Sequence, residues 1–366
     1  MNVASLFDGV DFCDEKTINI SEKFLEGNVE YNSRYAIGKN NDTLRLHQIV
    51  PLTGIIDDFS APGEVWHGIP VVKTKEISSN SLIANCSTSI SPVNVNLHLA
   101  RYGLLNVVAF NELVIASRGA LDWPNFVKSM RSDLSIYTES WQRLYDNLSD
   151  DISRKTFIDI VKFRLSANVH LMSSYKVRIH EQYFEGFMNY SSEVFVDAGG
   201  YDGDTSEVFA NKYNDYKDIL FFEPSRKNMK AARERLKNFR NIHFYDKGLS
   251  DQKDVLRFDP DAGSASAMSE NGVEMIEVDK LDDLVSQPVT FIKMDLEGWE
   301  LNALKGAVQH LKNDRPKLAI AAYHDSPDFR LIFEFIENFG IDYDVFMRHY
   351  TQGWSETVLF FRPKTY

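Results

Sequence analysis

A turn rich in glycine and acids follows the first apolar run in the second half of the chain. Asp197 ends this run, and Gly199 and Gly203 lie in the turn between the run and a predicted helix. Glycine accepts positive φ and has no Cβ, so such a turn lets a ligand come very close to the backbone. The pattern predicts that Asp197 faces a ligand held at this turn.

An acid stands at the end of the next apolar run, 20 residues after Gly203. Glu223 in FFEPS is placed to accept hydrogen bonds from both ribose hydroxyls of an adenosine, by the geometric logic of dinucleotide folds. A structural turn would explain the glycines alone, whereas the turn together with Glu223 indicates a nucleoside site. The dinucleotide fingerprint G-x-G-x-x-G is not met, because Gly199, Gly200 and Gly203 miss its register. An NAD-dependent enzyme is therefore the alternative interpretation.

Two carboxylates and a histidine follow later strand-like runs. Asp295 and Glu297 in MDLEGWE come just after one run, and His324 in AAYHDSPD follows the next. Open α/β folds bind ligands at this edge of the sheet, so the three side chains are candidates for a general base. Alternatively, Glu297 only favours the start of the following helix through its dipole, and His324 caps a helix. These acids and Asp325 could also hold a magnesium ion, but we favour a site without metal.

Short apolar runs alternate with amphipathic helical segments over this half of the chain. The predicted strands are 193–198, 219–222, 242–245, 291–294 and 318–322. A helix is predicted from the N-cap Ser225 to Phe239. Buried strands separated by such helices predict a parallel sheet that is covered on both faces. The last two runs, 343–348 and 357–361, are joined by too short a link for a helical crossover, so we expect them to pair antiparallel.

Four segments, VDAGGYDGDT, FFEPS, LDDL and IKMDLEGWELNALKGA, occur in this order between residues 196 and 307. They resemble the FkbM-type methyltransferases, which depend on S-adenosylmethionine and mostly methylate oxygen. The resemblance covers about residues 181–363 and implies a Rossmann-like α/β fold, with a mostly parallel seven-stranded sheet that ends in an antiparallel hairpin. Gly200-Tyr201 stands where the family has Ala-Asn, so side-chain contacts there should differ.

The resemblance also implies roles for single residues. Asp197 and the glycines of the turn would hold the methionine part of S-adenosylmethionine, Glu223 would hold its ribose, and Asp246 or Gly248 would border its adenine. The expected cofactor-binding residues are Asp197, Gly199, Tyr201, Gly203, Thr205, Glu223, Asp246 and Gly248. The expected catalytic residues are Asp295, Glu297 and His324.

The length of 366 residues exceeds the roughly 250 to 300 residues that one hydrophobic core supports. We expect a smaller α/β domain over 1–122, a helical connector over 123–190 and the methyltransferase domain over 191–366. The first of these resembles a degenerate nucleotide-binding domain, with Asp57 or Asp58 after its second strand. Only Gly38 lies in the turn after its first strand, so packing or homo-oligomerisation is a better expectation than nucleotide binding.

Composition excludes several classes of protein. The net charge of −13 argues against a nucleic-acid partner, because phosphate binding requires clustered Lys and Arg. No run approaches the roughly 18 apolar residues of a membrane span. Two cysteines and a start without a secretory signal pattern favour the cytoplasm.

Three function classes remain. The first is an S-adenosylmethionine-dependent O-methyltransferase acting on a hydroxyl of a sugar, a glycan or a secondary metabolite. The second is a nicotinamide-dependent sugar oxidoreductase, and the third is a non-catalytic scaffold. Glu223 and the pair Asp295 and Glu297 favour the first class.

Overall fold

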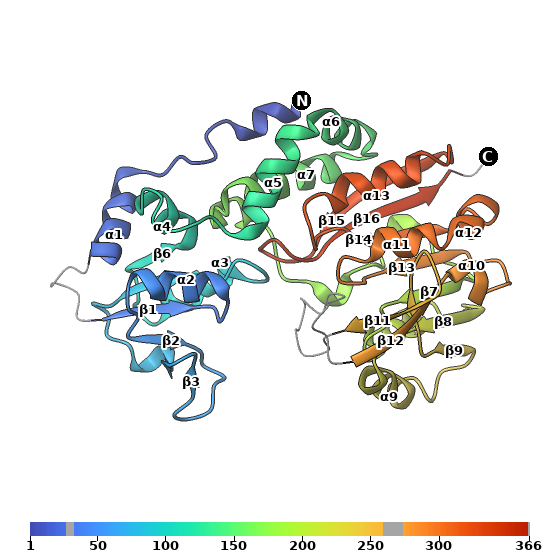
Figure 1. Cartoon of the computed structure of the whole chain (residues 1–366), viewed down its shortest axis with the longest axis horizontal. Helices are drawn as coiled ribbons and strands as arrows, with labels where there is room; N and C mark the ends of the chain where they lie inside the picture. Colours follow the sequence, from blue (N-terminus) through green and yellow to red (C-terminus); the bar gives the residue numbers. More distant parts are fainter. Residues whose placement is uncertain (27–32, 259–273, 365–366) are drawn as a thin grey trace. The chain divides into compact units, whose positions relative to one another are not determined.

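The computed structural model describes residues 1–26, 33–258 and 274–364 (Figure 1). Two compact units make up the chain. The first comprises Met1–Thr138, Phe157–Val177 and Thr351–Ser355, and the second comprises Glu139–Thr156, Arg178–Tyr350 and Glu356–Tyr366. Each unit is made of three separate segments of the chain. The predicted division over 1–122, 123–190 and 191–366 instead makes each part from one continuous segment. That division stays a prediction.

The first unit is built on a six-stranded sheet of order β3-β4-β2-β1-β5-β6. Its strands are β1 (Arg34–Ile37), β2 (Gly54–Ile56), β3 (Val65–Trp66), β4 (Ile69–Val72), β5 (Leu82–Asn85) and β6 (Val107–Ala109). All neighbouring pairs are parallel except β3 with β4. The helices that lie wholly within this unit, among the described residues, are η1 (Val3–Phe7), α1 (Glu15–Glu26), α2 (Asn41–Ile49), η2 (Thr74–Glu76), α3 (Pro92–Arg101), α4 (Phe110–Ala116), α5 (Asn125–Ile136) and η3 (Val169–Met172). Parallel strands with crossover helices confirm the smaller α/β fold that the sequence predicts.

Helices α6 (Thr138–Asn147) and α7 (Asp151–Ser166) lie where the chain passes from one unit to the other. Arg348 forms an ion pair with Asp150, 2.7 Å away, just before α7 begins. This contact fixes the start of α7 to the second unit. Two short helices, η4 (Ile179–Glu181) and η5 (Gly186–Met188), then lead into that unit.

The second unit contains a seven-stranded sheet of order β15-β16-β14-β13-β7-β8-β9. Its strands are β7 (Val194–Ala198), β8 (Asp218–Phe222), β9 (Ile242–Tyr245), β13 (Phe291–Met294), β14 (Lys317–Ala321), β15 (Tyr343–His349) and β16 (Thr357–Pro363). Neighbours from β14 to β9 are parallel, while β16 runs antiparallel to both β14 and β15. This arrangement confirms the predicted mostly parallel sheet and its antiparallel end.

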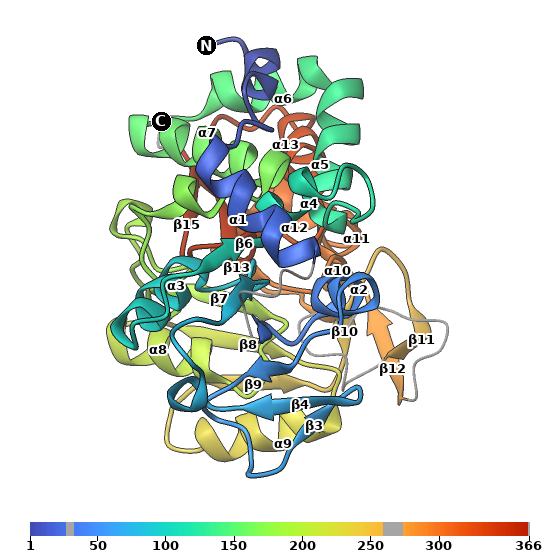
Figure 2. The same ribbon diagram turned by 90° about the vertical axis from the view of Figure 1, so that its left-hand side faces the viewer.

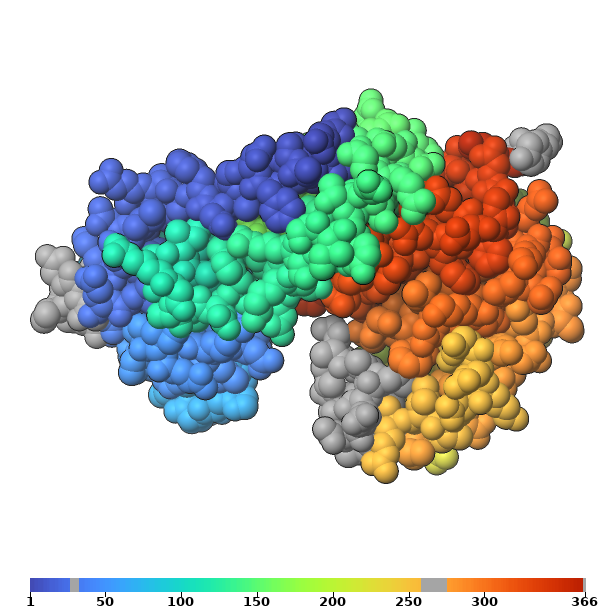
Figure 3. Space-filling view, turned by 45° about the horizontal axis from the view of Figure 1, so that its top comes forward, coloured from blue at the N-terminus to red at the C-terminus, as the bar shows by residue number. Residues whose placement is uncertain are grey.

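Burial explains why the central strands read as continuous apolar runs. All five residues of β7 and all four residues of β13 are buried, as expected for strands covered on both faces. The helices of this unit are α8 (Asp204–Lys212), α9 (Arg226–Arg235), α10 (Leu281–Leu284), α11 (Glu300–Lys305), α12 (Val308–Asn313) and α13 (Asp328–Glu337). Helices α11 to α13, orange to red, form a continuous surface in Figure 3.

The predicted helix from Ser225 to Phe239 is shorter than expected. Ser225 does cap α9, but the helix ends at Arg235, and Leu236 closes it by donating its backbone N–H to Ala232. Phe239 lies in the turn that follows and packs against the core by its side chain. Phe239 packs against the same core as the apolar face of α9, so its position in the sequence fitted the helical pattern although it lies beyond the end of the helix.

A small second sheet was not expected from the sequence. It consists of β10 (Gly248–Leu249), β11 (Asp254–Phe258) and β12 (Glu274–Asp279), in the order β10-β12-β11. Figure 2 shows β11 and β12 side by side.

Among the described residues, no helix combines the length and apolar character that a bilayer crossing requires.

Candidate active site

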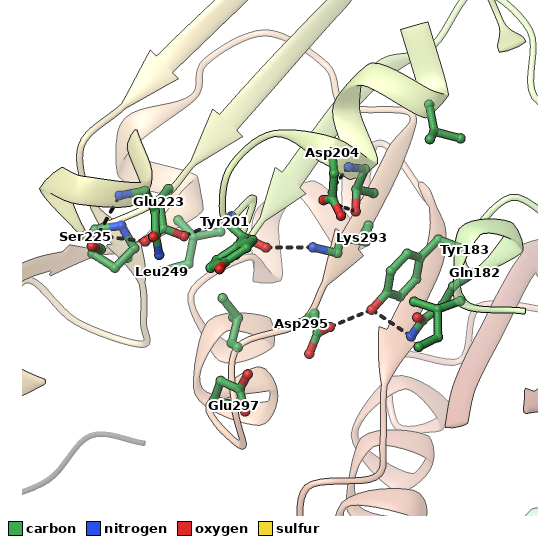
Figure 4. A pocket seen from close by; sticks show the side chains of 18 of the residues that line it. Gln182, Tyr183, Tyr201, Asp204, Glu223, Ser225, Leu249, Lys293, Asp295 and Glu297 are labelled. Atoms are coloured by element: carbon green, nitrogen blue, oxygen red, sulfur yellow. Dashed lines mark hydrogen bonds between the residues drawn. The ribbon is translucent and has the colours of Figure 1, made fainter. Parts of the chain in front are cut away.

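A pocket of about 860 Å³ lies in the second unit, where β7, β8 and β13 end (Figure 4). Parallel strands bring their carboxyl ends to one edge, and this edge is where open α/β sheets bind ligands. The pocket is lined by these residues predicted from the sequence: Gly199, Tyr201, Thr205, Glu223, Gly248, Asp295 and Glu297. Residues from three different strand ends thus share one cavity.

Gly199 is fixed by the neighbouring strand. Its φ is +73°, and a Cβ built there would lie 1.9 Å from the backbone oxygen of Asp295. Gly203 serves a different purpose, because it precedes α8 with φ +87° and a Cβ there would lie 3.1 Å from Leu236. The first glycine therefore shapes the pocket wall, and the second permits α8 to pack against α9.

Asp197 does not line the pocket, contrary to the prediction that it faces a ligand. It is fully buried, accepts a hydrogen bond from Ser206 at 2.6 Å and forms an ion pair of 3.0 Å with Lys293. Lys293 also donates to the backbone oxygens of Gly199 (2.8 Å) and Ala198 (3.3 Å). Asp197 thus acts on the glycine turn through Lys293.

Lys293 lines the pocket and was missed by the sequence analysis. The available signal was a lysine in the middle of the apolar run IKM, since a charge in a fully buried strand requires a partner. The partner follows from the register, in which Lys293 lies opposite Asp197 on the neighbouring strand.

Asp246, which was predicted to border an adenine, does not line the main pocket. Its side chain is 65% exposed and pairs with Arg233 at 3.2 Å. It lines a separate shallow pocket with Lys247 and Phe244. Gly248, the other residue predicted to border an adenine, lines the main pocket with Leu249 and Ile276.

Glu223 is buried at the end of β8 and is oriented by the backbone. Its carboxylate accepts hydrogen bonds from the N–H of Tyr201 (3.0 Å) and of Ser225 (2.8 Å). Burial raises the pKa of Glu223 from its ordinary value of 4.5 to about 7, although these two N–H groups oppose the rise. A carboxylate has about four acceptor positions, so Glu223 can still accept hydrogen bonds from a ligand in the pocket.

This raised pKa predicts how stability changes with pH. Glu223 binds its proton more tightly in the folded chain than in the unfolded chain, so its contribution to stability is complete below pH 4.5 and is lost as the pH rises through about 7. We expect the melting temperature of Glu223→Gln, relative to that of the unsubstituted protein, to increase between pH 5 and pH 7.5. Thermal unfolding of both proteins without ligand across this range measures the effect.

The control is Glu337→Gln, because Glu337 is exposed on α13. It should follow the unsubstituted protein at every pH. Parallel curves for Glu223→Gln and the unsubstituted protein would contradict the raised pKa.

Acids gather at the other end of the pocket. Asp295 and Glu297 line it together with Glu356, which sits between β15 and β16. The burial of Glu297 and its closeness to Asp295 raise its pKa to about 8, and similar causes raise the pKa of Glu356 to about 7. His324 does not line the pocket, but its Nε2 lies 3.3 Å from Asp295 and 3.4 Å from Glu297. The structure thus brings the three predicted catalytic residues together.

Two residues from the segment before β7 complete this end of the pocket. Tyr183 donates its hydroxyl to Asp295 at 2.6 Å, and Gln182 donates to the Tyr183 hydroxyl at 2.9 Å (Figure 4). Gln182 also donates to Glu356 at 2.9 Å. The family resemblance begins near residue 181, but it implied no role for Gln182 or Tyr183. No periodicity could indicate these contacts, because they depend on where an irregular segment crosses the sheet edge.

A seven-stranded, mostly parallel sheet with one antiparallel strand near its end and a glycine-lined pocket at its carboxyl edge defines a Rossmann-like methyltransferase fold. Residues 197–343 match the family model of the methyltransferase FkbM domain. The resemblance seen in the sequence is confirmed.

A solved structure supports the fold. The chain is similar to the crystal structure of methyltransferase FkbM from Methylobacillus flagellatus KT, with 23% identity, a TM-score of 0.73, and coverage of 98% of this chain and 97% of that chain. That similarity includes the first unit. An rRNA methylase from Streptococcus thermophilus is more distant, with 16% identity, a TM-score of 0.32, and coverage of 48% of this chain and 89% of that chain. Comparison with curated protein sequences finds no match.

Proposed function

We propose that the chain is an S-adenosylmethionine-dependent O-methyltransferase that acts on a hydroxyl of a sugar, a glycan or a secondary metabolite. The observation that carries this proposal is one pocket lined both by the glycine turn with Glu223 and by the acids Asp295 and Glu297. A volume of about 860 Å³ falls within the range of roughly 300 to 1,000 Å³ for small-molecule sites.

The residues present fit S-adenosylmethionine. Gly199 lines the pocket, and a Cβ there would lie 1.9 Å from the Asp295 backbone oxygen, so only glycine lets this turn pack against the end of β13. Glu223 would hold the ribose hydroxyls, Tyr201 and Thr205 would border the methionine part, and Gly248 would border the adenine. When bound, this cofactor supplies a methyl group on an already activated sulfonium.

The chain itself must align an acceptor and receive its proton. Orientation of two bound reactants can account for roughly 7 to 11 kcal/mol of a barrier, and a positioned base contributes about 10² to 10⁴ in rate. Of the three candidate bases, Glu297 lines the pocket with a partly exposed side chain. His324 is almost buried and does not line the pocket. Asp295 already accepts the Tyr183 hydroxyl. We therefore assign proton transfer to Glu297, with Asp295 and His324 as its neighbours.

Calorimetric titration tests the cofactor. We expect binding of S-adenosylmethionine and S-adenosylhomocysteine, and the proposal fails if only NAD binds. Transfer of an isotopically labelled methyl group to a panel of free sugars, glycans and hydroxylated metabolites then tests the acceptor. Labelling of nitrogen in place of oxygen would contradict O-methylation.

Glu223→Gln is expected to weaken binding of S-adenosylhomocysteine by about 1 to 3 kcal/mol, or roughly 5- to 150-fold. The amide keeps the shape of the side chain but replaces one buried acceptor with a donor, so hydrogen bonds to a ribose are lost. Titration at pH 8 measures the change.

Asp246→Asn is the matched control, because Asp246 follows the next strand but lies outside the pocket. Its effect should stay below about threefold. Equal losses of affinity in both variants would remove Glu223 from the ribose site.

Homo-oligomerisation through the first unit, the lack of a nucleic-acid partner and a cytoplasmic location remain predictions from the sequence.

A further inference from the structure

Three side chains with metal-binding atoms meet beside the pocket, just beyond β13 and β14. Asp295 follows β13, Glu300 begins α11, and His324 follows β14. One ligand atom from each lies within 4.8 Å of the other two. Two of these side chains are almost inaccessible, since Glu300 is 1% and His324 is 8% exposed. Asp295 is 23% exposed and opens onto the pocket.

Glu300 offers a carboxylate oxygen that the described residues do not use. Its Oε1 accepts the backbone N–H of Leu296 at 2.6 Å, and the N–H of Gly298 lies 3.4 Å away. Its Oε2 is buried and, among the described residues, has no hydrogen-bond partner. An unsatisfied buried oxygen on an acid is costly, so this atom indicates a ligand.

Among the described residues, Lys293 and His324 lie near these acids and can carry positive charge. The Lys293 ammonium is occupied by Asp197 and by two backbone oxygens. His324 is the ion-pair partner shared by Asp295 (3.3 Å) and Glu300 (3.9 Å). A divalent cation would add positive charge between the Asp295 and Glu300 carboxylates.

We propose that Asp295, Glu300 and His324 bind a divalent transition-metal ion such as Mn²⁺. Bonds of about 2.0 to 2.2 Å to one ion require ligand atoms roughly 3 to 3.5 Å apart, so closure by about 1 Å assembles the site. Two carboxylates and an imidazole suit a transition metal better than Mg²⁺, which keeps water and prefers oxygen ligands. Glu297 is next to the site, with its Oε2 3.4 Å from His324 Nε2.

The ion would lie at the wall of the pocket, because Asp295 lines it. A cation there can polarise an acceptor hydroxyl and orient it toward Glu297. This role rests on the proposed function, whereas binding of the ion does not. It would also make Asp295 and His324 ligands, which leaves Glu297 as the base.

The test is metal binding to the full chain after chelation and dialysis. Titration with Mn²⁺, followed by electron paramagnetic resonance of the free ion, should give one bound ion per chain, with Mg²⁺ bound at least about tenfold more weakly. Glu300→Gln and His324→Ala should each weaken Mn²⁺ binding at least about tenfold. Circular dichroism and thermal unfolding establish that each variant is folded.

Asp246→Asn is the control, since it removes an exposed acid that lies outside the pocket and is not a proposed ligand. It should change Mn²⁺ affinity less than about threefold. Lack of Mn²⁺ binding by the unsubstituted chain, or equal Mn²⁺ affinity in Glu300→Gln, would overturn the site. Binding of Mg²⁺ as tight as Mn²⁺ would overturn His324 as a ligand. S-adenosylhomocysteine titration of the metal-free chain separates failure of this site from failure of the proposed function.

Discussion

Gly199→Ala is expected to lower the free energy of unfolding by about 3 to 5 kcal/mol and to weaken S-adenosylhomocysteine binding more than about thirtyfold. The new Cβ would lie 1.9 Å from the Asp295 backbone oxygen and 3.0 Å from its carbonyl carbon. Neither strand can easily yield, because Asp295 donates its N–H to Ala198 at 3.2 Å beside this contact. Denaturant unfolding and calorimetric titration measure the two effects.

Gly340→Ala separates the clash from the backbone strain. Gly340 has φ +63°, and a Cβ there would meet no atom within 4 Å. A positive φ costs a residue with a Cβ about 1 to 2 kcal/mol, so only this loss is expected, with unchanged ligand affinity. If Gly199→Ala behaved like Gly340→Ala, the close approach of the turn to the next strand would be wrong.

Lys293→Met is expected to destabilise the chain by about 3 to 5 kcal/mol, the usual effect of leaving a buried charge without its partner. Lys293 and Asp197 are both buried, and their charged atoms are 3.0 Å apart. The substitution also removes the donor that the Gly199 and Ala198 oxygens share. Denaturant unfolding measures the loss, and a weaker affinity for S-adenosylhomocysteine should accompany it.

Two further variants make this result specific. Lys364→Met removes a partner of Asp342 in a pair whose side chains are 46% and 47% exposed, and it should change stability by less than about 1 kcal/mol. The double variant Asp197→Asn with Lys293→Met should lose less free energy of unfolding than the two single variants lose in sum. The reason is that the double change leaves no unpaired buried charge. A loss for Lys293→Met as small as that for Lys364→Met would refute the role of the pair.

Local patterns were sufficient for much of the second unit. The runs at 242–245 and 291–294 became strands with the predicted bounds, and Ser225 caps a helix. Parallel strands necessarily carry their carboxyl ends to one edge, so Gly199, Glu223 and Asp295 could be assigned to one site. The small sheet formed by β10 to β12 was missed, although residues 275–278 alternate between exposed and buried.

Errors in the candidate site came from side-chain direction. Asp197 lies near the end of β7 and Asp246 follows β9, yet the first is buried and the second is exposed to solvent. Spacing in the sequence cannot distinguish these directions, because they depend on the strand or helix packed against each residue.

The sequence by itself determined the fold class, the glycine turn and the order of acids along one sheet edge, because hydrophobic periodicity and glycine placement act over a few residues. Only the tertiary structure decided that Lys293 forms an ion pair with Asp197. It also decided that Tyr183 and Gln182 donate hydrogen bonds to acids of the pocket, and that Glu300 and His324 lie beside Asp295. These partners are distant in sequence, and strand register and packing bring them together.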